Sequence, residues 1–387
     1  MKASGNSPLV RHLVLLGGGH SHLAVLKHLG MHPVAGLSVT LISRDIETPY
    51  SGSLPGHISG IYKHDEIHID LRPLAQFAGA RIIQSEVTRV DFENKIIYYK
   101  DRPAIHFDLI SINIGSKPNA AKIPGADKHA IGIKPIDQFL KHWQTLRGDI
   151  ITRIREEKSE YQLLIVGGGP ASVELAFAVQ YRIHNELAVK PFKESRLKIS
   201  IITADSEILK FHNSKTRSYT NSELSKRGIK VLPEHKVIKF SAGAILCEND
   251  TQLSADAMIY ATGASIPQWP ADCGLAIADD GFIEVNDFLQ STSHEFVFAA
   301  GDAASIRGKP RPKSGVYAVR QGKPLAENLL RYATGRKMLA HTPQKHALAL
   351  INFANKTAIA SRNKLFLRGR LLWTLKNSID TGFIRKY

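Results

Sequence analysis

Residues 11–26 read RHLVLLGGGHSHLAVL, and this stretch decides the first half of the fold. The apolar run before the glycines predicts a short buried strand, and the apolar positions after them predict a helix. This order places the turn at a helix N-terminus, where a pyrophosphate binds. Gly17 makes a turn that no side chain tolerates, and Gly19 lets the backbone approach the pyrophosphate. His20 and Ser21 open the helix beside that site.

The same pattern returns at residues 161–178, which read YQLLIVGGGPASVELAFA. Here Gly167 and Gly169 are the turn glycines, and Pro170 and Ala171 open the helix. Two strand–turn–helix units separated by the length of a domain predict two dinucleotide sites in one chain. A protein that holds FAD in one domain and a nicotinamide cofactor in the other has this layout.

Length and composition are those of a globular protein with two or three domains. The chain has 387 residues, of which 43% are hydrophobic and 22% are charged. Its two cysteines, Cys247 and Cys273, form neither a disulfide framework nor a four-thiolate metal site. The first residues show no signal-peptide pattern, and no apolar run is long enough to span a membrane. We therefore expect a cytoplasmic protein.

The net charge of +16 is concentrated in one segment. Residues 307–387 hold eighteen lysines and arginines, with Glu327 and Asp380 as their acids, whereas residues 1–306 sum to zero. A neutral body with a basic tail predicts one face attracted to an anionic membrane, nucleic acid or acidic protein.

Two further segments resemble the flavoproteins with two dinucleotide-binding domains that are called pyridine nucleotide-disulphide oxidoreductases. Residues 107–116, FDLISINIGS, look like the strand and turn that close the first nucleotide unit. Residues 257–264, AMIYATGA, look like the counterpart in the second unit. The resemblance makes Gly115 and Gly263 members of the two sites.

Residues 296–304, FVFAAGDAA, resemble the late FAD motif of this family. The resemblance covers roughly residues 10–335 and implies that Asp302, placed by Gly301, contacts the FAD ribitol. It also implies FAD as cofactor and NADH as hydride donor, with NADPH as the alternative.

The resulting prediction is an α/β fold with two Rossmann-like domains, the second inserted in the first, and a basic C-terminal tail. We expect the two parts of the FAD domain at 8–118 and 266–335 and the NAD(P)H domain at 119–265. Residues 336–387 would form a hairpin followed by an amphipathic segment.

A narrower likeness is carried by TPYSGSLPG at 48–56 and PKSGVYAVRQG at 312–322. Both resemble the oxidoreductase half that is fused to some selenide, water dikinases, a branch near type II NADH dehydrogenases and sulfide:quinone reductases. The likeness implies that the isoalloxazine ring lies against Pro49, Tyr50, Ser51 and Gly315.

The family chemistry is transfer of a hydride from NADH to flavin N5, followed by passage of the electrons to a quinone-like acceptor. By resemblance Lys313 lies near the pyrimidine end of the flavin, where a cation stabilises the reduced form. A solvated lysine in a basic loop is the alternative. Glu174 falls where the family has an acid close to the nicotinamide, and the alternative is an acid that complements the helix dipole. No CxxC pair supports disulfide redox chemistry.

The acid that usually ends the second strand and binds ribose is missing from both units. In the first unit we expect Ser43 to bond the adenosine ribose and Arg44 to cover the adenine or pyrophosphate. In the second, Asp205 could accept from the ribose 2′-OH, which favours NADH. Lys210 and Arg217 leave a 2′-phosphate site for NADPH open.

The seventeen histidines do not predict a metal site. His20 and His22 lie in a phosphate loop, where the geometry of the helix start explains them. His64 and His68 lack a ligand cluster of clear metal-binding spacing.

The tail predicts a hairpin at 347–361 and then a basic amphipathic helix. Residues 361–387 would lie on an anionic membrane, at the inner face of the cell membrane, and admit quinone. Alternatively, their apolar face packs on the chain's own FAD domain or on a second subunit in a homodimer. Nucleic acid is disfavoured because no binding module accompanies the charge. The apolar positions of the helix are Leu372, Leu375, Ile379 and Phe383.

The sequence does not identify the electron acceptor. Type II NADH dehydrogenases have a quinone-associated Gln where this chain has Val316, which weakens the quinone hypothesis. The alternatives are a reductase for a soluble acceptor in selenium or sulfur metabolism and a non-enzymatic flavin redox sensor.

Overall fold

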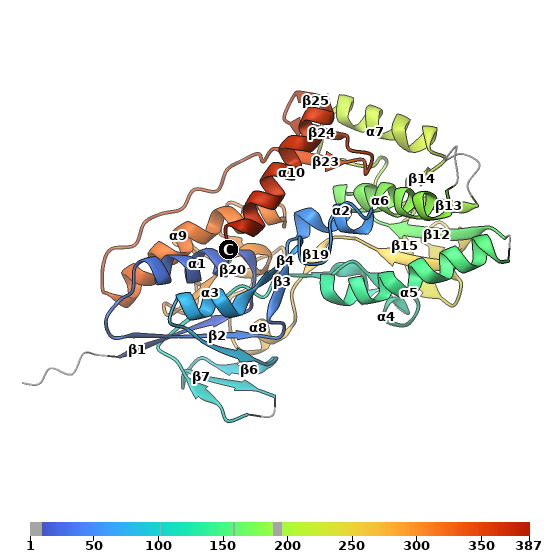
Figure 1. Ribbon diagram of the computed structural model, residues 1–387. Coiled ribbons are helices and arrows are strands. Elements are labelled where there is room, and N and C mark those ends of the chain that lie inside the picture. The colour runs from blue at the N-terminus through green and yellow to red at the C-terminus, as the bar shows by residue number, and fades with distance from the viewer. Residues whose placement is uncertain (1–9, 101, 158, 189–195) are drawn as a thin grey trace, which may run out of the picture.

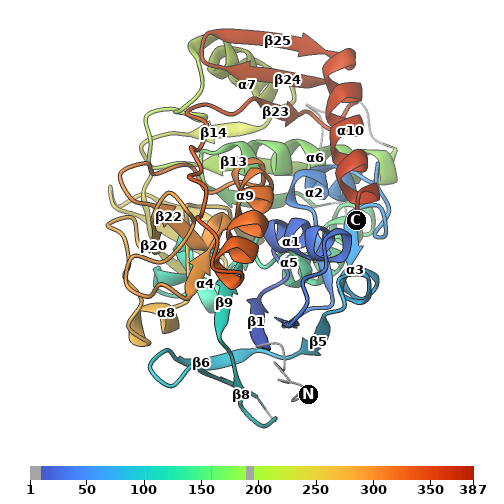
Figure 2. The same ribbon diagram turned by 90° about the vertical axis from the view of Figure 1, so that its left-hand side faces the viewer.

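Two parallel sheets organise the molecule (Figures 1 and 2). The computed structural model describes residues 10–100, 102–157, 159–188 and 196–387. Most residues in the strands of both sheets are apolar and buried, as expected where helices cover both faces of a parallel sheet. The α/β prediction is confirmed.

The first sheet has the order β21-β9-β1-β2-β5. Helix α1 follows β1 directly and packs against α9 and α3. The bounds are β1 (Arg11–Leu16), α1 (His20–Met31), β2 (Leu37–Ser43), α3 (Leu71–Phe77), β5 (Arg81–Gln84), β9 (Leu109–Ile112), β21 (Val297–Ala299) and α9 (Gly315–Ala333).

The second sheet has the order β11-β18-β12-β13-β14 and repeats the pattern of the first. The bounds are β11 (Ile131–Gly132), α5 (Ile136–Arg155), β12 (Tyr161–Val166), α6 (Pro170–Leu187), β13 (Leu197–Ile202), α7 (Ser214–Lys226), β14 (Lys230–Leu232) and β18 (Ala257–Tyr260).

Smaller elements connect the two sheets. Each parallel unit carries a three-stranded antiparallel sheet, β6-β7-β8 in the first and β15-β16-β17 in the second. Their bounds are β6 (Val87–Asp91), β7 (Ile96–Tyr99), β8 (Ile105–His106), β15 (Val237–Ser241), β16 (Ala244–Cys247) and β17 (Gln252–Ser254). The connecting elements are β3 (Glu47–Pro49), α2 (Leu54–Ile58), β4 (His68–Asp70), β10 (Lys117–Pro118), α4 (Ala126–His129), β19 (Ala264–Ser265), α8 (Trp269–Asp272), β20 (Ile283–Val285) and β22 (Ala304–Ile306), with 3-10 turns at Ser51–Ser53, Asn119–Lys122 and Gly301–Ala303.

The second unit is inserted into the first. Strand β21 pairs in parallel with β9, so the first sheet is completed only after the chain has passed through the second sheet. The hydrophobic core of the first unit accordingly joins residues such as Leu13 and Ile110 to Val297 and Leu329. This topology places the carboxyl ends of β1 and β9 and the residues that follow β21 at one edge of the sheet.

The C-terminal tail folds back over both units. Strands β23 (Ala349–Asn352), β24 (Ala358–Arg362) and β25 (Leu365–Gly369) form an antiparallel sheet, and α10 (Arg370–Arg385) follows it. In Figure 2 the sheet lies beside α7, and α10 descends from it toward α1 and α3. Within the described residues, none of the helices is both long and apolar enough to cross a bilayer.

Candidate functional site

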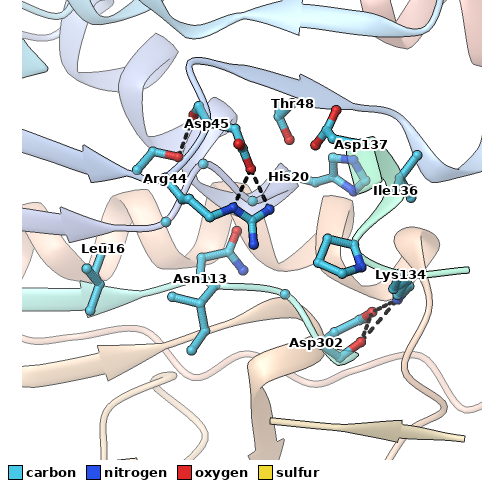
Figure 3. Close-up of a pocket in the computed structure, with 18 of the residues that line it drawn as sticks. Leu16, His20, Arg44, Asp45, Thr48, Asn113, Lys134, Ile136, Asp137 and Asp302 are labelled. Atoms are coloured by element: carbon cyan, nitrogen blue, oxygen red, sulfur yellow. Dashed lines mark hydrogen bonds and ion pairs between the residues drawn. The ribbon is translucent and has the colours of Figure 1, made fainter. Parts of the chain in front are cut away.

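A cavity of about 320 Å³ lies at the carboxyl edge of the first sheet, beside the first glycine turn (Figure 3). Ligands of open α/β sheets bind at this edge. The structure brings together there, from six segments of the chain, the predicted residues Gly17, Gly19, His20, Ser43, Arg44, Pro49, Ser51, Gly115, Asp302 and Gly315.

Three predicted FAD residues support the wall of this cavity instead of lining it. The Ser21 hydroxyl donates to the carbonyl of Ala318 at 2.7 Å, which fastens α1 to α9. The Gly301 N–H donates to Gln321 Oε1 at 2.6 Å. The ring of Tyr50 stacks on Phe383 from the tail, with 4.5 Å between ring centroids.

Asn113, at the end of β9, holds the first glycine turn in place. Its carbonyl accepts from the Gly19 N–H at 3.1 Å, and its side-chain oxygen accepts from the Ser21 N–H at 3.2 Å. A Cβ on Gly19 would overlap that side-chain oxygen, and Gly17 has a φ of +94°. The glycines are therefore required by contacts within the protein as well as by a ligand. The sequence analysis passed over Asn113, which lies within the quoted 107–116 segment.

The end of the cavity beside β2 contains an acid that was not predicted from the sequence. Asp45 lines the cavity two residues after the end of β2. Its carboxylate pairs with Arg44, and its carbonyl accepts from the Ser43 hydroxyl at 2.7 Å. The strand is followed by an acid after all, and Asp45 rather than Ser43 has the oxygens that suit a ribose hydroxyl.

Asp302 forms a polar cluster with Lys134 and Ser116 at the other end of the cavity (Figure 3). Lys134 Nζ lies 2.6 Å from Asp302 Oδ2 and 3.1 Å from Ser116 Oγ, and the Ser116 hydroxyl donates to Asp302 at 3.0 Å. Burial alone would raise the pKa of Asp302, but the charge of Lys134 and these hydrogen bonds hold it below its ordinary value. Asp302 is therefore an ionised acceptor.

Lys313 lies outside this cavity. Its Nζ donates to the carbonyl of Ala304 at 2.7 Å, approaches Asp280 at 3.5 Å and stands 3.9 Å above the Phe282 ring. Burial lowers the pKa of Lys313, although Asp280 opposes this. The described lysine closest to Asp302 is Lys134, so the role predicted for Lys313 stays a prediction.

Histidines expected to serve the fold have partners within the protein. His22 is buried under the first turn, with one ring nitrogen 2.6 Å from the Gly17 carbonyl and the other 2.9 Å from Ser111 Oγ. Burial lowers the pKa of His22 to about 4. The His64 and His68 rings stack 3.8 Å apart. Both cysteines are free thiols.

The second glycine turn is packed against the protein at Gly167 and Gly168 but is open at Gly169, whereas Asn113 fills the space beside Gly19 in the first turn. Gly167 has a φ of +136°, Gly169 and Gly263 have open space where a Cβ would stand, and Pro170 and Ala171 are exposed. A backbone hydrogen bond fixes this turn, because the Leu209 N–H donates to the Gly168 carbonyl at 2.7 Å. Beside it Asp205 pairs with Lys210 at 2.7 Å, and both side chains are about half exposed.

A buried ionic group joins α6 to the tail. Glu174 accepts from the Asn352 N–H at 2.8 Å, and Lys376 donates to Asp380 and to the carbonyl of Gly52, each at 2.8 Å. Burial raises the pKa of Glu174 to about 7 even though Lys376 opposes this. Burial also raises the pKa of Asp380, and the two carboxylates raise the pKa of Lys376 against the effect of its burial. Glu174 was predicted from the sequence, whereas Lys376 and Asp380, which have the i,i+4 spacing of a helical ion pair, were not predicted as site residues.

The tail helix uses two faces. Lys376, Asp380 and Phe383 point inward, and Phe383 packs on Tyr50 and, 5.6 Å away, on His20. Leu375 and Ile379 belong instead to an exposed apolar stripe that begins with Leu371, which is 86% exposed. The expected single apolar face with Leu372, Leu375, Ile379 and Phe383 is wrong, because the inward face is partly ionic.

Comparison with protein families gives one match over most of the chain. The family described as pyridine nucleotide-disulphide oxidoreductase matches residues 11–322. Among curated proteins, the NADH dehydrogenase-like protein YutJ of Bacillus subtilis is 23% identical over 384 residues, which cover 95% of this chain and 99% of the relative. Demethylphylloquinone reductase NdbB of Synechocystis is 24% identical, with 80% of this chain and 79% of the relative covered.

Solved structures with the same fold include these two. The sulfide:quinone oxidoreductase of Aquifex aeolicus superposes with a TM-score of 0.80 at 17% identity, covering 97% of this chain and 91% of that one. NDH2 of Plasmodium falciparum, in complex with NADH, superposes with a TM-score of 0.78 at 19% identity, and 97% of each chain is covered.

Proposed function

Because the chain belongs to the pyridine nucleotide-disulphide oxidoreductase family, we propose that it is an FAD-dependent NADH oxidoreductase that reduces a quinone-like acceptor. The single observation that carries this proposal is the placement of Glu174. It lies at the start of the helix that follows the second glycine turn, and Lys376, whose charge acts on it, bonds the Gly52 carbonyl of the predicted flavin loop.

The residues of the cavity suit FAD. The first glycine turn and the N-terminus of α1 would hold the pyrophosphate, Asp45 and Arg44 the adenosine, and Asp302 the ribitol. When bound, FAD supplies acceptance of a hydride from the nicotinamide and delivery of the electrons to a second acceptor. The chain's own part is to position these groups and to handle protons.

Glu174 is suited to supply a proton to the acceptor. Reduction of a quinone by two electrons consumes two protons, and a carboxyl group with a pKa of about 7 is about half protonated at neutral pH. Lys376 is hydrogen-bonded to Asp380 and acts on Glu174 through its charge alone, so the burial of Glu174 still favours retention of its proton. The Asn352 N–H, which donates to Glu174 at 2.8 Å, ties this acid to the tail.

The exposed stripe of α10 supports attachment to an anionic membrane. Leu371, Leu375 and Ile379 are exposed along one face, and Leu365 and Leu367 are exposed on the neighbouring β25. Exposed basic residues lie next to Leu365, Leu367 and Leu371 in the sequence, and each basic residue near an anionic surface adds about 1 kcal/mol. The basic residues are Arg362, Lys364, Arg368 and Arg370.

Spectroscopy tests the central proposal. The purified protein should be yellow, and anaerobic NADH should bleach the flavin absorbance; a protein without flavin, or a flavin that NADH leaves oxidised, would refute it. Stopped-flow reoxidation with a quinone series and with soluble acceptors then identifies the acceptor class. NADPH is compared with NADH in the same series.

Flotation with vesicles tests the membrane part separately. We expect the intact protein to float with vesicles that contain anionic lipid, and the triple substitution of Leu371, Leu375 and Ile379 by Ser to abolish this. Leu339→Ser is the matched control, because Leu339 is 51% exposed on another surface. Equal flotation of the triple variant would exclude this stripe as the docking surface.

A soluble acceptor is the second candidate. Val316, where type II NADH dehydrogenases have a Gln, is 39% exposed and presents an apolar side chain. Together with the likeness to the oxidoreductase half of some selenide, water dikinases, this supports a selenium- or sulfur-linked acceptor. Absence of flotation combined with fast turnover of a soluble acceptor would favour it.

A further inference from the structure

The pair formed by Lys134 and Asp302 joins the two units at the cavity. Lys134 belongs to the second unit, between β11 and α5, whereas Asp302 follows β21 of the first. The Nζ–Oδ2 distance is 2.6 Å, the Lys134 side chain is 30% exposed and the Asp302 side chain is 12% exposed. Nothing in the proposed function so far uses Lys134.

The charges that line the cavity make this cation important. Acidic side chains outnumber basic ones: Asp45, Glu47, Glu86, Asp137 and Asp302 face Arg44, Lys117 and Lys134, with His20 as a further titratable group. Arg44 is paired with Asp45 beside β2, away from Asp302, and Lys117 is exposed (Figure 3). FAD is itself anionic through its pyrophosphate, so its binding needs a cation in a cavity with this balance. Lys134 lies at the end of the cavity where Asp302 is expected to meet the flavin.

We propose that Lys134 is a positioning residue for the flavin. It holds Asp302 as an ionised, oriented acceptor, and it supplies the positive charge that favours the reduced form of the bound flavin. This inference rests on the proposed function, because it takes FAD as the occupant of the cavity. It also makes the redox balance of the flavin depend on how the second unit is placed, since Lys134 comes from that unit.

Titration of the apoprotein with FAD, followed by fluorescence, is the first test. Lys134→Met should weaken FAD binding at least tenfold, whereas Lys134→Arg, which keeps the charge, should stay within threefold of the wild type. Lys141→Met is the matched control, because Lys141 is exposed on α5 of the same unit. Unchanged FAD affinity in Lys134→Met would overturn the proposal.

The midpoint potential of the bound flavin is the second readout. Removal of the cation should make the potential more negative by about 30 mV or more, which is a tenfold shift toward the oxidised form for a two-electron couple. A purely structural role would lower thermal stability and leave the potential of the flavin unchanged. That outcome would also overturn the proposal.

A double-mutant cycle tests whether Lys134 acts through Asp302 and covers the case in which the single variant folds poorly. In an Asp302→Asn background only the charge of Lys134 remains to act on FAD, so Lys134→Gln should lose less FAD affinity than it does in the wild type. A full tenfold loss in that background would show that Lys134 does not act through Asp302.

Failure of the proposed function can be told apart from failure of this inference. If FAD binds but NADH does not reduce it, the oxidoreductase proposal fails, while the effect of Lys134 on affinity and potential is still measured. If NADH reduces the flavin and both readouts are unchanged in Lys134→Met, only the role of Lys134 fails.

Discussion

The two glycine turns have the same three letters and differ in what surrounds the third glycine. At the first, Asn113 fills the space beside Gly17 and Gly19, and the cavity closes around the turn. At the second, Gly169 has open space and the first residues of α6 are exposed. An enclosed turn suits a cofactor that stays bound, and an open turn suits a cosubstrate that enters and leaves in every cycle. The glycine motif predicts where a pyrophosphate binds, and the packing around the motif indicates whether the bound nucleotide stays or exchanges.

The largest expected effect is that of Gly19→Ala. The new methyl group would overlap the side chain of Asn113, and such overpacking costs about 1–3 kcal/mol of folding free energy. The first turn should shift, and the protein should be purified with less than a tenth of the wild-type flavin. The ratio of absorbance at about 450 nm to that at about 280 nm measures the flavin content, and thermal unfolding measures the stability. Full flavin content would show that the first turn tolerates a side chain.

Glu174→Gln should have the next largest effect. It tests whether the helix after the second turn carries a functional acid that the helix after the first turn lacks. The matching position after the first turn is Ala24, a small residue that packs close to Gly322 of α9. Because Glu174 donates only when protonated, acceptor turnover of the wild type should fall as pH rises through about 7. Glu174→Gln should lower this turnover about 10²-fold and lose that pH dependence.

The rate of flavin reduction by NADH is the control for Glu174→Gln and should change less than threefold. A variant that keeps the pH dependence would assign it to another group.

Glu174 also predicts a linked effect on stability. Its pKa is higher in the folded protein than in the unfolded chain, so the carboxyl group favours unfolding increasingly as pH rises from about 4.5 to about 7. Glu174→Gln should therefore flatten the pH dependence of unfolding in this range.

Gly169→Ala should act only on the nicotinamide cofactor. The Cβ has open space, and the backbone φ of −84° accepts any residue, so the fold and the flavin content should be unchanged. The methyl group stands where the pyrophosphate of NADH approaches, and we expect KM for NADH to rise about tenfold, or about 1.4 kcal/mol. Loss of flavin in this variant would contradict the comparison of the two turns.

The smallest expected effect is that of Lys210→Ala at the open turn. The ion pair with Asp205 is about half exposed and is worth at most about 1 kcal/mol. Without Lys210, Asp205 would repel a 2′-phosphate more strongly, so kcat/KM for NADPH should fall up to about fivefold while that for NADH stays within twofold. Steady-state rates with both nucleotides measure the ratio. If kcat/KM fell for NADH alone, Lys210 would not act on the 2′-phosphate.

Local patterns made the two turns and the α/β fold predictable, because strand, glycines and helix are neighbours in sequence. Ser21 shows where this ends: its place in the motif indicates a ligand, yet its hydroxyl binds Ala318 on a helix from the far end of the chain. Lys134 and Asp302 are likewise brought together only by the insertion of one unit in the other. A sequence pattern carries no information on which distant carbonyl or carboxylate will stand opposite a side chain.

The tail shows the same limit at larger scale. Helical spacing in α10 was predicted correctly, but a one-faced amphipathic pattern could not reveal that Lys376 turns inward, because lysine at the protein surface is the ordinary case. Its burial depends on two carboxylates, one of them Glu174, about two hundred positions earlier in the chain.

The tail also has a consequence for how the protein is made. Ile351, Phe353 and Ile359 belong to the hydrophobic cluster of the second unit, although that unit's own sheet is finished by Tyr260. During synthesis this cluster stays incomplete until residues 349–359 have left the ribosome, and Glu174 stays without Lys376 until α10 has followed. We therefore expect nascent chains that end before residue 349 to expose apolar surface on α6, so the folding of residues 349–385 determines when this surface is protected from aggregation.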